Sequence, residues 1–225
     1  IGFWRPVSTL ASLIGVANGV LVYLFFDLMH EATEQTGARD VVSWAVFLGS
    51  LGVSFVGLVA LESSQVFGGR SGNRMLSLPY MIAVGMGLHN LGEGLAIGAS
   101  YASGEYTLSA LLVAGFGLHN GTEGFGIVGA AGKTPMSWRD VFLLGLIAGL
   151  PTCVGTFLSG QGVSSYFSIC FYALAAGSLL YVVLSLTVMS YTATRRVQVA
   201  AGIFAGISLM YVTAMVLALV SGVRS

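Results

Sequence analysis

Two copies of a His-Asn-x-x-Glu-Gly motif hold the residues of this sequence with the clearest chemistry. Residues 87–99 read GLHNLGEGLAIGA and residues 117–129 read GLHNGTEGFGIVG, with seven of thirteen positions identical. In each copy the histidine and the glutamate are four residues apart, so on a helix they project from one face about one turn apart. The four residues are His89, Glu93, His119 and Glu123. Asn90 and Asn120 follow the two histidines and border the same face.

Two imidazoles and two carboxylates make a nitrogen and oxygen ligand set for a divalent cation. Such ligands suit zinc, and also iron, manganese or cobalt. The simpler interpretation is that the histidines and glutamates pair with each other and hold two helices together. The motif glycines have a structural interpretation of their own, because glycine permits close helix packing. They are Gly92, Gly94, Gly98, Gly121, Gly124 and Gly126.

The composition places these motifs in a membrane. Of the 225 residues 56% are hydrophobic and only 8% are charged, against roughly a quarter charged in a soluble domain. The net charge is zero and there is no basic stripe, which argues against binding to nucleic acid. Cys153 and Cys170 lie in apolar stretches, and we expect both to be packing residues without a disulfide.

Seven stretches are long and apolar enough to cross a bilayer, which needs about 20 residues. They are residues 8–30, 41–61, 76–100, 107–131, 140–160, 165–191 and 197–221. We therefore predict an all-α polytopic membrane protein with a single domain over residues 1–225. His89 and His119 lie near the centres of two consecutive segments, so the motifs meet at the bilayer midplane. Ionisable groups there need a compensating partner, which a cation supplies.

Basic residues in the connections predict the orientation. If the segments alternate, seven of the nine fall on one side: Arg5, Arg70, Arg74, Lys133, Arg139, Arg195 and Arg196. Arg39 and Arg224 fall on the other side. The positive-inside rule then places the N-terminal end in the cytoplasm and the C-terminal end outside. The outer connections are acidic.

The two motifs, HNLGEG and HNGTEG, resemble the paired signatures of the ZIP (Zrt/Irt-like) divalent metal transporters, and the form HNGTEGFGI is similar to prokaryotic members. The resemblance implies that the seven segments correspond to family helices two to eight, with the first helix absent. It implies a main transport site of His89, Glu93, His119 and Glu123, with Asn90 and Asn120 lining an adjacent second site. It also implies a homodimer in the cell membrane.

The sequence departs from the family pattern at several of these positions. The family proline before each glutamate is Gly92 and Thr122 here, and Asn120 stands where some members have a carboxylate. A family glutamate next to a proline in helix six is Leu150 beside Pro151. These changes weaken a second metal site, so we expect one main site.

Asp27, His30, Glu31 and Glu34 recur three or four residues apart at the end of the first segment. Asp27, His30 and Glu31 form a candidate entrance site for metal. The alternative is a solvated helix end with a local ion pair. Pro151 frees a backbone carbonyl, which either faces the ion path or only shapes helix packing.

We expect a transporter, not an enzyme, that carries a divalent cation, zinc first and also iron, manganese or cadmium, through the midplane site into the cytoplasm. The cation is cargo, and no prosthetic group is expected. The expected partners are metal ions and membrane lipid. The alternative is an intramembrane zinc hydrolase, which requires His30, His89 and His119 to converge. Their positions along the segments place His30 roughly 15 Å or more from the other two.

Overall fold

The computed structural model describes residues 7–36, 40–64, 77–132, 134–159, 164–191 and 196–221, which form seven helices and no strand. The helices are α1 (Val7–Glu34), α2 (Val41–Ser63), α4 (Ser77–Ala102), α5 (Tyr106–Ala130), α6 (Trp138–Ser159), α7 (Ser165–Ser190) and α8 (Arg196–Ser221). The seven predicted segments are confirmed, and the largest difference is at the end of α1, which continues to Glu34.

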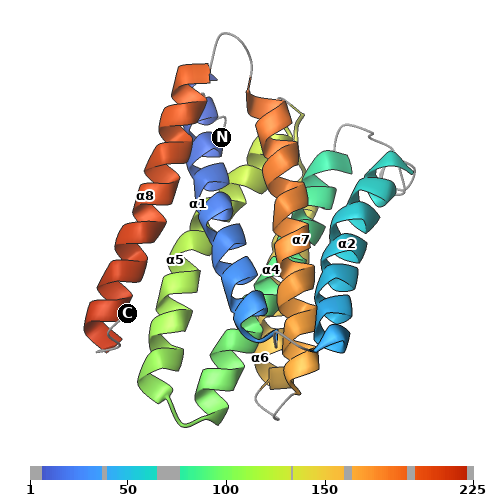
Figure 1. Cartoon of the computed structure of the whole chain (residues 1–225). Helices are drawn as coiled ribbons and strands as arrows, with labels where there is room; N and C mark the ends of the chain where they lie inside the picture. Colours follow the sequence, from blue (N-terminus) through green and yellow to red (C-terminus); the bar gives the residue numbers. More distant parts are fainter. Residues whose placement is uncertain are drawn as a thin grey trace.

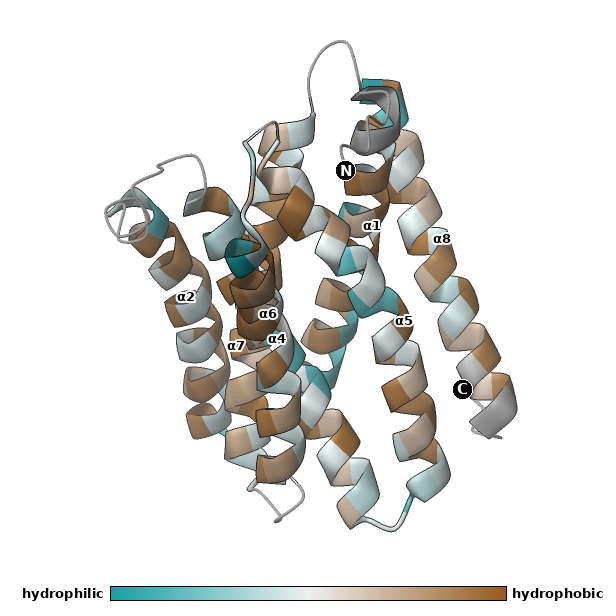
Figure 2. Ribbon diagram, turned by 180° about the vertical axis from the view of Figure 1, so that it is seen from behind, coloured by the Kyte–Doolittle hydropathy of each residue, from teal (hydrophilic) through white to brown (hydrophobic). Residues whose placement is uncertain are grey.

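The protein is an all-α polytopic membrane protein. Five helices are long and apolar enough to cross a membrane: α1, α2, α6, α7 and α8. The motif-bearing α4 and α5 are of similar length, 26 and 25 residues, and their His, Asn, Glu and Gly residues lower their hydropathy. Figure 2 shows teal, hydrophilic bands midway along helices that are otherwise brown and white.

Consecutive helices run in opposite directions, and α1 begins at the end of the bundle opposite to that at which α8 ends (Figure 1). We call the end at which α1 begins the N-terminal end. Most of the basic residues behind the predicted orientation lie outside the described residues, namely Arg5, Arg39, Arg70, Arg74, Lys133, Arg195 and Arg224. Arg139 and Arg196 are described, and both lie where a helix begins at the N-terminal end.

Local interactions define several helix starts. The Asp40 carboxylate accepts a hydrogen bond from the Val42 amide at 3.0 Å and caps α2. Ser137 and Asp140 bond reciprocally at the start of α6, each side chain accepting from the other's backbone N–H at 3.1 Å. Between α4 and α5 the chain turns in three residues, with Gly104 at a φ of 81°. A left-handed glycine ends a helix in this way, and the short turn makes α4 and α5 antiparallel neighbours.

The interior of the bundle is formed mainly by α1, α4 and α7. Around it the helices pack in close pairs, α4 with α6, α1 with α8 and α2 with α7. The outer helices expose large apolar side chains such as Phe157 at 70% and Phe204 at 73%. Exposed apolar surface of this kind suits contact with lipid.

The prediction that motif glycines permit close packing is confirmed for some and wrong for others. A Cβ at Gly94 would lie almost on the backbone carbonyl oxygen of Thr152 in α6. Gly92 and Gly126 also lie against neighbouring side chains. Gly121 and Gly124 on α5 have no such neighbour within 4 Å of a Cβ position, because their side of α5 is not covered by another described helix.

Candidate metal centre

The two motifs meet inside the bundle, as predicted. His89 and Glu93 project from α4, and His119 and Glu123 from α5, with all four side chains buried. The helical spacing of four residues puts His89 Nε2 3.1 Å from Glu93 Oε1 on the same helix. The three-residue turn between the helices sets the register that brings the two pairs together.

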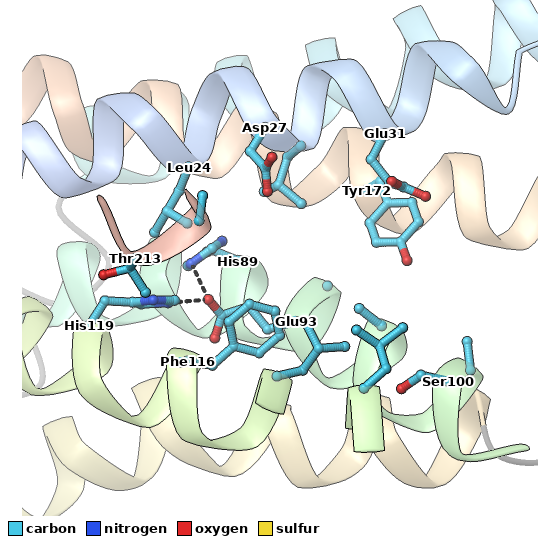
Figure 3. Close-up of a pocket in the computed structure, with 18 of the residues that line it drawn as sticks. Leu24, Asp27, Glu31, His89, Glu93, Ser100, Phe116, His119, Tyr172 and Thr213 are labelled. Atoms are coloured by element: carbon cyan, nitrogen blue, oxygen red, sulfur yellow. Dashed lines mark hydrogen bonds and ion pairs between the residues drawn. The ribbon is translucent and has the colours of Figure 1, made fainter. Parts of the chain in front are cut away.

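Glu93 lies at the centre of the cluster (Figure 3). Its Oε1 lies 3.1 Å from His89 Nε2 and 2.5 Å from His119 Nε2, so one carboxylate oxygen contacts both imidazoles. Glu123 contacts only His89, at 3.4 Å. Within the described part of the chain, His89, Glu93 and His119 are the group whose potential ligand atoms all lie within 4.8 Å of one another. Three of the four predicted main ligands therefore converge, and the fourth adjoins one of them.

The cluster has charge and lone pairs that suit a cation. Two carboxylates carry two negative charges when ionised, and neutral imidazoles add none. Polar atoms of the cluster are buried without a hydrogen-bond partner, among them His89 Nδ1 and Asn120 Oδ1. Because most buried polar atoms in proteins are paired, such atoms indicate a ligand or water in their company. A divalent cation would balance the charge and draw the carboxylates and imidazoles to itself.

The two asparagines behave differently from each other. Asn120 donates from Nδ2 to Glu93 Oε2 at 3.3 Å, so it belongs to the cluster. Asn90 donates from Nδ2 to the backbone carbonyl of Ala148 on α6 at 2.9 Å, so its amide group is directed to a neighbouring helix. Leu150, where the family pattern places an acid, is 52% exposed and lines a separate shallow groove with Gly87 and Pro151. The position at which the family pattern has an acid therefore lies in this groove and not among the residues of the cluster.

A cavity of about 520 Å³ leads from the cluster towards the end of the bundle that is opposite the N-terminal end. Its floor includes His89, Glu93 and His119, and its rim includes the exposed Glu31 and Glu105. The remaining wall comes mainly from α1, α4 and α5, with three residues of α8 and Tyr172 of α7 (Figure 3). On the other side of the cluster, towards the N-terminal end, the fully buried Met86 and Leu186 pack around Gly126.

The three residues of the candidate entrance site line two different pockets. Asp27 and Glu31 line the central cavity, while His30 lines a second pocket that it shares with Asp27. His30 also lies 3.4 Å from Glu34, with both side chains largely exposed, at 71% and 63%. Asp27 and Glu31 are four residues apart and lie on one side of α1, whereas His30 and Glu31 are consecutive and point about 100° apart around the helix.

Several cavity residues were missed by the sequence analysis. Phe116 packs edge-on against the His119 ring, with centroids 5.4 Å apart, and could have been found from its position one turn before the histidine. Tyr172 and Thr213 come from α7 and α8, and no local sequence signal marks them. Glu105 lies in the turn between the motif helices, and its side chain does not cap α5.

Comparison with known proteins gives one partial similarity. No family model matches the chain. Over 131 residues the chain is 34% identical to the human protein Zinc transporter ZIP4, and the matched region covers 56% of this chain. The chain spans 20% of the length of that relative. The buried cluster of histidine and glutamate on two antiparallel membrane helices is thus found in a chain partly similar to a zinc transporter.

Proposed function

We propose that this chain is the membrane domain of a ZIP-type transporter of divalent metal cations, with zinc as the first candidate. The observation that carries the proposal is the buried cluster in which Glu93 contacts both His89 and His119. Polar groups of this kind inside a membrane are costly and mark ion pathways. The partial similarity to a zinc transporter supports the same class of cargo.

In the proposed mechanism the cation binds to His89, Glu93 and His119, with Glu123 adjoining. Asn120 holds the second oxygen of Glu93, and Asn90 and Asn120 offer at most a weak second position. The cargo reaches the site through the 520 Å³ cavity, whose rim carries Glu31 and Glu105. Asp27 stands between rim and floor and attracts the cation along the way.

The proposed direction of transport is from outside to cytoplasm. By the charge rule, the N-terminal end of the bundle is cytoplasmic, so the cavity faces outside. The packed side chains of Met86 and Leu186 separate the site from the cytoplasmic end. Transport therefore requires a second conformation in which this apolar layer opens.

The structure does not favour the hydrolase alternative, because the three histidines do not lie together. The hydrolase needs three histidines on one zinc ion, but His30 is exposed, pairs with Glu34 and lies outside the wall of the central cavity. The cluster of His89, Glu93 and His119 has a different composition from a three-histidine site.

The test is zinc uptake by the purified protein in liposomes with a zinc-sensitive dye inside. We expect uptake that is lost in His119→Ala and retained in Leu118→Ala. Leu118 is the adjacent residue on the same helix but is 74% exposed on the outer side, so it controls for a disturbance of α5. Equal zinc uptake by His119→Ala and Leu118→Ala would reject the proposal. It would also be rejected if the unmodified protein binds zinc but takes none up. Lipid hydrolysis by the same preparation would favour the alternative.

A further inference from the structure

Asn90 is adjacent to a proposed metal ligand but is directed towards another helix. It is 2% exposed, and its Nδ2 donates to the Ala148 carbonyl of α6 at 2.9 Å. Its neighbour His89 points into the cavity. One turn of α4 therefore presents a proposed ligand to one side and an interhelical bond to the other.

The Asn90 bond lies at a special point of α6. Pro151 has no N–H, so the Ile147 carbonyl four residues before it lacks its helical donor. The next carbonyl along, that of Ala148, receives the Asn90 amide. The Asn90 amide therefore binds a carbonyl one residue beyond the one that Pro151 leaves without a helical donor, and not that carbonyl itself.

Glycines hold α4 and α6 together on both sides of Asn90. A Cβ at Gly87 would lie within 2.5 Å of the Ile147 carbonyl oxygen, and one at Gly94 would lie almost on that of Thr152. From α6, a Cβ at Gly155 would lie almost on the Leu91 carbonyl oxygen. Gly87, Asn90 and Gly94 are spaced by three and four residues, so they form one stripe along α4.

This stripe determines how α4 is rotated about its own axis. Side chains extend about 5–6 Å from a helix axis, so a roll of roughly 10° moves a ring by about 1 Å. Binding sites hold their groups within about 0.5 Å of the working geometry. The glycines set the distance between the helices but tolerate some roll, whereas a directional hydrogen bond does not.

We propose that Asn90 is a positioning residue: its amide, held on the Ala148 carbonyl beside the proline of α6, fixes the rotation of α4 and thereby aims His89 and Glu93. The inference rests on the proposed metal site. It assigns the function of Asn90 to its N–H donor, whereas a metal ligand would use its oxygen.

Asn90→Asp separates these two roles. Aspartate keeps an oxygen ligand and adds charge, but it removes the donor and sets a carboxylate against the Ala148 carbonyl. Asn90→Ala removes both groups. If Asn90 positions α4, Asp and Ala should each weaken Co²⁺ binding by about 10–100-fold, the range for residues that orient metal ligands. The d–d absorption spectrum of bound Co²⁺ should also change, because the ligands are misaimed.

Ser54→Ala is the matched control. Ser54 is buried and donates to the Leu174 carbonyl at 2.6 Å, so it is also an interhelical side-chain bond to a backbone carbonyl, but it joins α2 to α7. We expect a lower melting temperature and an unchanged Co²⁺ spectrum. Binding by Asn90→Asp that equals or exceeds the unmodified protein would overturn the proposal.

A measurement without metal keeps the inference testable if the proposed metal site fails. Spin labels at Tyr101 on α4 and Phe157 on α6, both exposed, report the relation of the two helices. With Cys153 and Cys170 replaced by alanine, the distance distribution between the labels should broaden in Asn90→Asp and not in Ser54→Ala. An unchanged distribution would refute the positioning role, whereas absence of Co²⁺ binding by the unmodified protein would refute the proposed function.

Discussion

Replacing the carboxylates of the cluster and of the cavity rim by amides should weaken zinc binding in a graded order. Glu93→Gln keeps the shape of the side chain and removes its charge. Glu93 is 3% exposed and contacts both imidazoles, so it is the carboxylate on which the cluster depends most. Breaking a buried charge interaction by removing one partner costs about 3–5 kcal/mol. At about 1.4 kcal/mol per tenfold, zinc affinity should fall by about 10²- to 4 × 10³-fold.

Two further variants provide a comparison for the loss of zinc affinity in Glu93→Gln. Glu123→Gln should weaken binding less than Glu93→Gln, because Glu123 is equally buried but contacts only His89, at 3.4 Å. Glu105→Gln removes a charge at the exposed rim of the cavity. Water and salt screen such a charge, so affinity should change by about fivefold or less.

The assay is competition for zinc against a chelating dye, with detergent-purified protein at one pH and one salt concentration. Size-exclusion profiles and melting temperatures establish that the variants are folded. Zinc uptake into liposomes should follow the same order. Zinc affinity in Glu93→Gln within threefold of the unmodified protein, or a larger loss in Glu105→Gln than in Glu93→Gln, would refute the assignment of Glu93 to the centre of the site.

The remaining predictions concern pH, packing and stoichiometry. Zinc affinity should fall as the pH is lowered, because protons compete with the cation for the imidazole nitrogens; a binding midpoint independent of pH would contradict this. Gly94→Ala should lower the melting temperature, since its Cβ meets the α6 backbone, whereas Gly121→Ala should leave it unchanged or raise it, because its position is open and alanine favours a helix. The hydrogen bond from Tyr166 holds the pKa of Asp40 below its usual range. The lowered pKa of Asp40 stabilises the fold above the usual aspartate pKa, and this stabilisation is lost as the pH falls through the lowered value. Tyr166→Phe removes the hydrogen bond, so the melting temperature should begin to fall at a higher pH than in the unmodified protein. Purified protein should retain one zinc ion per chain after mild chelation, because a second dication beside Asn120 would meet too little negative charge; two retained ions would show this to be wrong.

The helices and the contents of the cluster could be predicted from the sequence because both depend on local spacing. A run of apolar residues long enough to cross a bilayer sets a helix, and a spacing of four residues places His89 and Glu93 on one side of it. A three-residue turn then leaves α4 and α5 little freedom except to lie antiparallel. These parts of the structure need no knowledge of the other helices.

The surroundings of the site could not be predicted in the same way, because they depend on which helix packs beside which. Asn90 borders the ligand face in the sequence, and only the presence of α6 gives its amide a carbonyl to bind. Leu150 is exposed in a shallow groove between α4 and α6, apart from the central cavity. Asp27 lines the cavity and His30 does not, although three residues separate them. Each outcome follows from tertiary packing across more than fifty residues of sequence or from the roll of a helix.

The two motif copies share seven of thirteen residues, including the His, Asn and Glu, but they are unequal in their surroundings, and this inequality determines the chemistry of the site. The glycines of the α4 copy lie against α6 and α7, whereas Gly121 and Gly124 of the α5 copy face open space. The more enclosed helix supplies Glu93, which contacts both histidines, and the less enclosed helix supplies Glu123, which contacts one. A symmetric pair of motifs would predict equal losses for the two glutamates. The packing predicts unequal ones, so the order of the two glutamate variants tests whether sequence repetition or helix packing sets the geometry of the site.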